Sequence, residues 1–219
     1  MSEQIKKFLE AEDLDDLQRT KEELGDLDDQ DITLICSTLK QWNPVQALSN
    51  LLFHPVVIPS AIRIEVILKA LTDHQNPYIV LAAIVGLQDI DIQQISEEER
   101  DCIVMSLLEI MKNNETILAD RASVSILPLL SKREMEKVFR LMSHPSVTTC
   151  HNLLGWLYRE VANENLTEFM KMAEQAKIPP ETREKVAQIL DEDEKMKTRG
   201  LPSLLGSHLY SYIPNRKEI

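Results

Sequence analysis

Glycine is scarce in this chain, with only 5 residues among 219. Two large fold classes depend on glycine, because all-β proteins use it in tight turns and nucleotide-binding α/β folds use it close to phosphates. Both classes are therefore disfavoured. The chain is instead rich in Leu, Ile, Glu and Lys, which are good helix residues. The composition predicts an all-α fold.

The chain also lacks a continuous apolar run of about 18 residues, which a membrane-spanning helix needs. Its first residues, MSEQIKKFLEAEDLDD, hold no apolar h-region, so no signal peptide is expected. Three cysteines are present, Cys36, Cys102 and Cys150, and none lies in a C-x-x-C pair. We expect them to be buried free thiols in a reducing compartment. These features predict a cytoplasmic protein.

Basic residues are outnumbered, because 24 Lys and Arg against 36 Asp and Glu give a net charge of −12. Most of the excess lies in residues 1–31, which hold 12 acidic and 4 basic residues. Nucleic-acid affinity rests largely on neutralising phosphates, so this charge argues against a nucleic-acid partner. It argues in the same way against an anionic membrane surface. It favours a basic protein partner, attracted in a manner that depends on ionic strength.

Patterns of known catalytic and metal sites are absent as well. No G-x-x-x-x-G-K-[ST], G-x-G-x-x-G, H-E-x-x-H or G-x-S-x-G occurs. The five histidines lack zinc-ligand spacing, and Cys150 with His144 carries no signature of a catalytic nucleophile. The acidic runs that begin at Asp26 and Asp89 lack the glycine and glutamate of an EF-hand. We assign no catalytic, cofactor-binding or metal-ligating residue, and expect neither a cofactor nor enzymatic activity.

A repeated pattern of a polar residue, a proline and an apolar run is what the chain does contain. It occurs at His54-Pro55, Asn76-Pro77 and His144-Pro145. Proline has no backbone N–H to lose in the first turn of a helix, and its fixed φ suits that position. The pattern therefore predicts repeated helix starts joined by short connections.

Apolar residues at helical spacing fill the segments around these prolines. They predict roughly 9–11 helices in a single domain over residues 1–200, with acidic helices in residues 1–31 as its cap. Residues 88–96 are the clearest loop. The helix from Tyr78 to about Leu87 is apolar on nearly every side, so we expect it to be buried between neighbours. Residues 201–219 form an apolar C-terminal tail that is too broken for a long helix.

Residues 76–88, NPYIVLAAIVGLQ, resemble the second-helix signature of HEAT-type repeats, Asp/Asn-Pro-x-Val-Arg-x-x-Ala-x-x-Ala-Leu. The matching residues are Asn76, Pro77, Ile79, Ala83 and Leu87. Val80 stands in place of the usual Arg, and Gly86 in place of Ala. The resemblance implies a HEAT/ARM-like α-solenoid, an α-α superhelix of stacked antiparallel helix pairs. A tetratricopeptide-like stack is the alternative, but its Trp/Leu-Gly/Tyr pattern is not legible in this chain.

Two sets of residues are candidates for partner binding. HEAT-like grooves bind through one helix of each pair, which points to Arg63, Arg121, Trp156, Tyr158 and Arg159. For Trp156 the interpretation as a core residue is favoured over that of a groove-lining residue. The tail holds apolar residues that are poorly suited to water: Leu204, Leu205, Leu209, Tyr210, Tyr212 and Ile213. The tail either caps the stack or docks in a groove of a partner or of a second copy, which would give a homo-oligomer.

The function that fits these features is a non-enzymatic protein–protein interaction module, a scaffold or adaptor that uses a helical-repeat face and the tail. The alternative is a nucleic-acid-processing enzyme on a HEAT-like scaffold, such as a relative of DNA glycosylases. A basic groove separates the two hypotheses, and this chain lacks the surplus of basic residues that such a groove needs.

Overall fold

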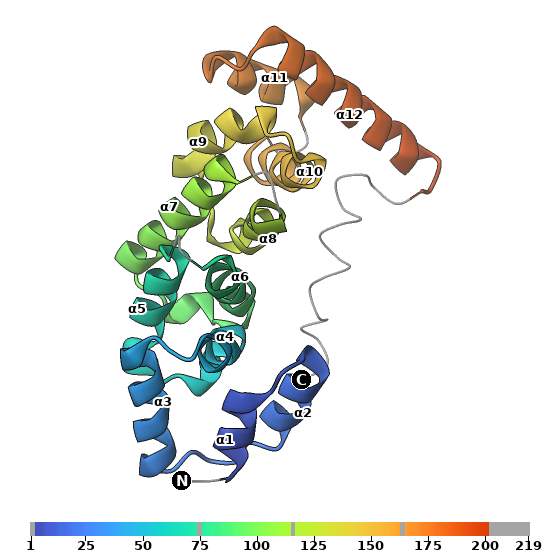
Figure 1. Cartoon of the computed structure of the whole chain (residues 1–219). Helices are drawn as coiled ribbons and strands as arrows, with labels where there is room; N and C mark the ends of the chain where they lie inside the picture. The colour runs from blue at the N-terminus through green and yellow to red at the C-terminus, as the bar shows by residue number, and fades with distance from the viewer. Residues whose placement is uncertain (1–2, 74–75, 115–116, 163–164, 202–219) are drawn as a thin grey trace. The chain divides into compact units, whose positions relative to one another are not determined.

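A computed structural model describes residues 3–73, 76–114, 117–162 and 165–201. Within these ranges the chain is all-α, with twelve α-helices and no strand, as Figure 1 shows. The all-α prediction is confirmed. The number of helices exceeds the predicted 9–11, because caps and prolines end the helices at short intervals. None of these described helices combines the length and the apolar character needed to cross a membrane.

The chain divides into two compact units, Met1–Ser106 and Leu107–Ile219, and each is described by itself. The single domain over residues 1–200 stays a prediction. The first unit holds α1 (Glu3–Glu10), α2 (Leu14–Glu22), α3 (Asp29–Gln41), α4 (Val45–Phe53), α5 (Ser60–Leu71) and α6 (Pro77–Gly86). The second holds α8 (Ile117–Ser125), α9 (Met135–Arg140), α10 (Val147–Trp156), α11 (Leu166–Gln175) and α12 (Pro180–Thr198). Helix α7 (Glu97–Asn113) begins in the first unit and ends in the second.

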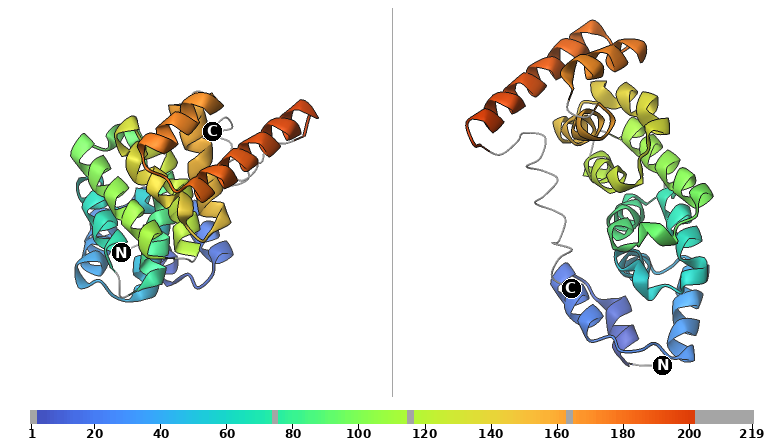
Figure 2. Two further views of the ribbon diagram at one scale, coloured as in Figure 1. Left: turned by 90° about the horizontal axis from the view of Figure 1, so that it is seen from above. Right: turned by 180° about the vertical axis from the view of Figure 1, so that it is seen from behind.

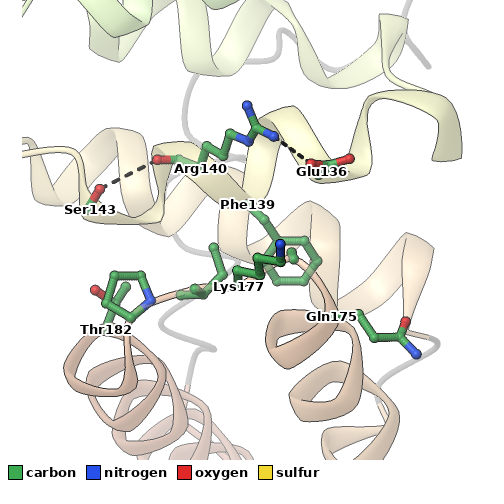
Figure 3. A pocket seen from close by; sticks show the side chains of 10 residues that line it. Glu136, Phe139, Arg140, Ser143, Gln175, Lys177 and Thr182 are labelled. Atoms are coloured by element: carbon green, nitrogen blue, oxygen red, sulfur yellow. Dashed lines mark hydrogen bonds and ion pairs between the residues drawn. The ribbon is translucent and has the colours of Figure 1, made fainter.

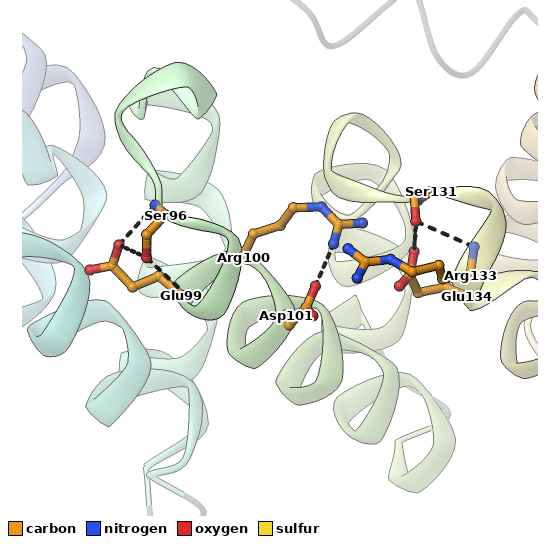
Figure 4. Close-up of polar contacts among 7 residues, drawn as sticks. All are labelled: Ser96, Glu99, Arg100, Asp101, Ser131, Arg133 and Glu134. Carbon is orange, nitrogen blue, oxygen red and sulfur yellow. Dashed lines mark hydrogen bonds and ion pairs between the residues drawn. The ribbon is translucent and has the colours of Figure 1, made fainter.

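Capping boxes begin two of the helical segments, as Figure 4 shows. Before α7, the backbone N–H of Ser96 donates to Glu99 Oε2 at 2.9 Å, and the N–H of Glu99 donates to Ser96 Oγ at 3.3 Å. Before α9, the N–H of Ser131 donates to Glu134 Oε2 at 2.7 Å. These bonds satisfy backbone groups that a helix start leaves without a partner. The box at Ser96 was predictable from the serine and glutamate three residues apart.

Only one of the three proline sites opens an α-helix directly. Asn76 caps α6, and Pro77 is the first residue of that helix. Pro55 instead begins a three-residue 3₁₀ turn, and Pro145 lies before Ser146, which caps α10. A helix does begin after His144-Pro145, at Val147, as predicted, although Ser146 and not the proline is next to its first residue. At His54-Pro55 the prediction of a helix start is wrong, because the chain there forms only the 3₁₀ turn and α5 begins later, at Ser60.

Other boundaries also differ from the expected ones. Helix α8 gives way to a 3₁₀ turn, Leu127–Leu129, around Pro128, which has no N–H for a helical bond. Helix α10 continues as a π-helical turn, Leu157–Val161. The predicted loop 88–96 includes a second 3₁₀ turn, Ile92–Gln94, so it is irregular but not unstructured.

The core of the first unit surrounds α6, which packs against α4 and α5. The buried residues of α6 are Ile79, Val80, Ala82, Ala83, Ile84 and Gly86. A Cβ atom on Gly86 would lie 1.9 Å from the carbonyl oxygen of Leu52 in α4. Position 86 therefore requires glycine, because the two helix backbones meet at this point.

Two polar side chains of α4 bind the N-terminal helices to the rest of the first unit. Asn50 Nδ2 donates to the carbonyl oxygens of Phe8 and Ala11, both at 3.0 Å. Gln46 Nε2 donates to the carbonyl oxygen of Ala11 at 2.8 Å. These bonds go to carbonyl groups at and just beyond the C-terminal end of α1, where a helix leaves carbonyl oxygens with few partners. The acidic helices of residues 1–31 are thus attached to the unit mainly at α4.

In the second unit, a polar seam joins α8 to α10. The carboxylate of Asp120 accepts hydrogen bonds from the hydroxyls of Ser146 and Thr149, the latter at 2.9 Å. Asn152 Nδ2 donates to Ser123 Oγ at 2.9 Å. Ser123, Thr149 and Asn152 are all buried, and buried polar groups are stable only when they are paired. The seam therefore fixes the register of the two helices.

The three cysteines are free, as predicted, but they are not uniformly buried. Cys36 and Cys150 are half-buried, whereas Cys102 is exposed. The buried face of α7 begins one residue later, at Ile103, so Cys102 shares the solvent side of that helix with Met105. The expectation of burial is wrong for Cys102.

Candidate interaction surface

The cationic residues predicted to line a groove are engaged within the fold. The guanidinium of Arg63 donates to the carbonyl oxygens of Ile58 at 2.9 Å and of Val56 at 3.1 Å. It thereby fastens the turn that precedes α5. Arg121 on α8 and Arg159 in the π turn are half-buried, and both have interaction partners. Their role in partner binding stays a prediction.

The predicted aromatic residues lie in the core. Trp156 is 7% exposed and Tyr158 is 9% exposed. The ring of Tyr158 meets that of Phe169 edge-on, with 6.1 Å between the ring centroids. Trp156, Tyr158 and Arg159 share one turn, whereas Arg63 belongs to the first unit.

The predicted tail residues lie outside the described residues: Leu204, Leu205, Leu209, Tyr210, Tyr212 and Ile213.

A different set of apolar side chains faces the solvent. Leu166 opens the odd-numbered α11 with 41% exposure, and five others occupy the first or second position of an even-numbered helix: Leu14 in α2, Val45 in α4, Tyr78 in α6, Ile117 in α8 and Val147 in α10. The exposed fractions of these five run from 43% for Val45 to 73% for Tyr78. The first turn of a helix usually carries acidic or polar residues. Apolar residues at this position in five successive even-numbered helices are therefore not a requirement of helix formation.

In the first unit, we call the three residues Leu14, Val45 and Tyr78 edge 1. The turn that precedes Leu14 is held against the first turn of α4 by the hydrogen bond from Gln46 to Ala11. This contact brings Leu14 and Val45 to the same end of the helices. Side chains in a first turn have no preceding turn to cover, so they extend beyond the helix end.

Tyr78 joins the same edge because α4 and α6 lie side by side, as both Figure 1 and Figure 2 show. Their C-terminal ends meet at Leu52 and Gly86. Leu52 lies seven residues after Val45, and Gly86 lies eight residues after Tyr78. Since these helical lengths match, Val45 and Tyr78 begin the two helices at the same end.

In the second unit, we call the two residues Ile117 and Val147 edge 2. The Nδ1 atom of His144 accepts a hydrogen bond from the N–H of Ser146 at 3.0 Å. Its Nε2 therefore carries the proton and donates to the carbonyl oxygen of Asn114, 2.9 Å away. This hydrogen bond joins the segment before α8 to the segment before α10. Ile117 and Val147, the first residues of these two helices, therefore lie at the same end of the pair. His144 acts here as a structural link.

The charge around edge 1 is uneven. Residues 10–16, EAEDLDD, hold five acidic residues and no basic one. Asp13 and Asp15 flank Leu14, and both are exposed. Helices α4 and α6 contain no charged residue. Edge 1 is therefore acidic at the α1–α2 turn and uncharged at Val45 and Tyr78.

Sequence reasoning did not single out Leu14, Val45 or Tyr78. The missed signal was position, because each stands directly behind a residue typical of helix starts, namely Asp13, Pro44 and Pro77. Apolar periodicity ranks residues by helical face, and it does not distinguish a first turn from an interior one.

A cavity of about 350 Å³ lies in the second unit, between α9 and the loop that joins α11 to α12 (Figure 3). Phe139, Lys177 and Thr182 are among the residues that line it. Arg140 turns its guanidinium to the carboxylate of Glu136, 2.5 Å away, as the figure shows. The lining residues include no pair of carboxylates and no nucleophile beside a base. The cavity therefore has no recognisable catalytic arrangement.

The pairing of Cys150 with His144 does not form a catalytic dyad. The thiol of Cys150 donates to the backbone carbonyl of His144, 3.1 Å from the sulfur, and the imidazole ring is engaged elsewhere. Burial raises the pKa of the Cys150 thiol, whereas an activated cysteine needs a lowered pKa. Among the described residues, no three His, Cys, Asp or Glu side chains are close enough to hold a metal ion.

Comparison with known proteins gives no match to this chain, whether with family models, with curated proteins or with solved structures.

Proposed function

We propose that this chain is a non-enzymatic protein-binding module, built from stacked helix pairs of the HEAT-like type, and that edges 1 and 2 contact its partner. The observation that carries the proposal is the recurrence of an exposed apolar residue in the first turn of five even-numbered helices, three in the first unit and two in the second. Large apolar side chains in solvent are typical of protein interaction sites when they cluster.

The spacing of the helices supports a repeat architecture. Helices α4 and α6 begin 32 residues apart, at Val45 and Pro77. Helices α8 and α10 begin 30 residues apart, at Ile117 and Val147. Helical repeats have periods of roughly this length or somewhat longer. A repeat that places the same helix end at regular intervals also places its exposed first-turn residue at regular intervals.

The alternative of a HEAT-like DNA glycosylase relative has weaker support. Its groove would need exposed cations, but Arg63 is engaged in the fold and the chain is acidic overall. A gel-shift with duplex DNA at low salt separates the two hypotheses, because clear binding would favour the nucleic-acid function.

The free thiols support a reducing compartment such as the cytoplasm.

Site-specific photocrosslinking tests the proposed function. Benzoylphenylalanine is placed at Val45, Tyr78 or Val147, and at Met105 and Leu166 as controls. Both control residues are exposed and apolar but lie on odd-numbered helices. Crosslinks to the same partner from the edge positions, and not from the controls, would support the proposal. Crosslinks from the control positions alone would refute it.

A further inference from the structure

Edge 1 differs from edge 2 in its electrostatic surroundings, and this difference bears on the partner. At edge 1, the exposed Leu14 is flanked in the sequence by the exposed acidic residues Glu12, Asp13 and Asp15, and Asp13 also caps α2. Asp16, the next acidic residue along the chain, forms an ion pair with Arg19. At edge 2, Asp120 is the acidic residue in the first turn of α8, and it accepts hydrogen bonds from Ser146 and Thr149.

Two lysines of the first unit, Lys69 and Lys21, make contacts away from the acidic turn. Lys69 Nζ lies 3.8 Å from the ring centroid of Trp42, and the indole Nε1 donates to Asp73 Oδ2 at 2.9 Å. The contacts of Trp42 with Lys69 and Asp73 join the C-terminal ends of α3 and α5. Lys21 pairs with Asp89, 3.7 Å away, on the opposite end of α2 from Leu14. Each lysine is therefore directed to a group other than the carboxylates of residues 10–16.

From these observations we infer that edge 1 is a docking site for an extended protein segment that carries a cluster of Lys or Arg next to apolar residues. The carboxylates of the α1–α2 turn complement the basic cluster, and Leu14, Val45 and Tyr78 contact the apolar residues. The inference rests on the proposed protein-binding function and specifies the partner for one of its two edges. Charge complementarity of this kind sets orientation and speeds association.

The packing of the helices sets the spacing of such a segment. Packed helices lie about 8–10 Å apart, so Val45 and Tyr78 are separated by about that distance. An extended chain covers this distance in about three residues. A matching segment therefore has two apolar residues about three positions apart, with its basic cluster on the side that faces α1 and α2.

Fluorescence anisotropy with three labelled 12-residue peptides tests the inference on the full chain. The peptides share two leucines three positions apart and differ at four other positions, which are all Lys, all Gln or all Glu. We expect the lysine peptide to bind at least about tenfold more tightly than the glutamine peptide, and the glutamate peptide to bind most weakly. Added salt should weaken only the binding of the lysine peptide, because the interaction of surface charges is screened.

Two variants and a matched control locate the binding. Tyr78→Ser should weaken binding of the lysine peptide about tenfold, and the double variant Glu12→Gln, Asp15→Asn should remove most of its advantage over the glutamine peptide. Val147→Ser, the equivalent change at edge 2, should leave binding unchanged. All four substituted residues are exposed, so unchanged circular dichroism is expected to show that each variant is folded.

The outcomes separate this inference from the proposed function. Equal binding of the three peptides, no binding of the lysine peptide, or binding that is insensitive to both edge-1 variants would overturn the inference. The proposed function would survive any of these results if the photocrosslinks still come from edge positions. Absence of edge crosslinks would instead remove the proposed function.

Discussion

Helices α4 and α6 pack against each other in the first unit, and α8 and α10 do so in the second, but different chemistry holds each pair together. The contact in the first unit is apolar and so close that Gly86 reaches the backbone of Leu52. The contact in the second unit is a polar seam around Asp120, Ser123 and Asn152. Side-by-side packing of these helices therefore does not require one set of residues. A sequence signature can therefore be legible in one pair and absent from the other.

The largest effect is expected at the backbone contact of the first unit. Gly86→Ala should lower the free energy of unfolding by about 3 kcal/mol, because the new Cβ overlaps the carbonyl oxygen of Leu52 and forces α4 and α6 apart. Urea unfolding followed by circular dichroism measures the loss. Gly25→Ala is the matched control, because nothing lies within 4 Å of its Cβ position. Equal stability of the two variants would show that the close approach is not real.

A smaller loss is expected at the polar seam of the second unit. Asp120→Ala should lower the free energy of unfolding by about 2 kcal/mol, because Ser146 and the buried Thr149 lose their acceptor. A double-mutant cycle with Thr149→Val should give a coupling energy of about 1 kcal/mol. Asp191→Ala, which breaks an exposed pair with Lys195, should cost less than about 0.5 kcal/mol. If the effects of the two substitutions are additive, Asp120 and Thr149 do not interact, and the polar seam is contradicted.

The polar contact of the first unit lies between α4 and α1 and should act locally. Asn50→Ala should cost about 1 kcal/mol and raise the rate of amide hydrogen exchange in α1, because carbonyl groups of that helix lose their donor. Exchange in α6 should not change. Gln18→Ala, which removes an exposed hydrogen bond to Glu22, serves as the control. Faster exchange in α6 as well would mean that α1 unfolds together with the whole unit.

The smallest effect concerns the ion contacts of Asp89 and should depend on pH. The ring of His54, whose Nδ1 lies 3.5 Å from Asp89 Oδ2, lowers the pKa of Asp89, and Lys21 adds to the effect. Because the folded-state pKa is lowered, the stabilisation is present at pH 7. It is lost as the pH falls through and below the ordinary value of 3.8.

Asp89→Asn tests this pH dependence. The free energy of unfolding should fall by about 0.5 kcal/mol at pH 7, since the carboxylate is partly exposed, and the difference from the parent chain should shrink steadily as the pH falls below 3.8. Asp26→Asn, at an exposed position, should show no difference at pH 7 or in acid. A difference that persists in acid would exclude the ion contacts as its cause.

Local structure was largely predictable, because the residues that determine it lie within a few positions of each other. The cap at Asn76 and the box of Ser96 with Glu99 are examples. Gly86 was visible as a departure from the HEAT signature. Its cause, the backbone of Leu52, lies 34 residues away and appears only once α4 and α6 are packed.

The candidate surface was less predictable, because exposure is decided by tertiary packing. Trp156 and Tyr158 are large residues in an apolar stretch, and the fold buries both. Tyr78 stands in an equally apolar stretch, but its place in the first turn of α6 exposes it. Cys102 differs from its buried neighbour Ile103 only by its helical face.

Methyl NMR of the full chain, with labelled Ile, Leu and Val, tests the central claim most directly. The labels report on Leu14 and Val45 at edge 1, and on Ile117 and Val147 at edge 2, in one titration with the lysine peptide. We expect the methyl resonances of Leu14 and Val45 to shift with a common saturation curve, while those of Ile117 and Val147 stay in place. Unmoved resonances at Leu14 and Val45, despite saturation with the peptide, would contradict edge 1 as the binding surface.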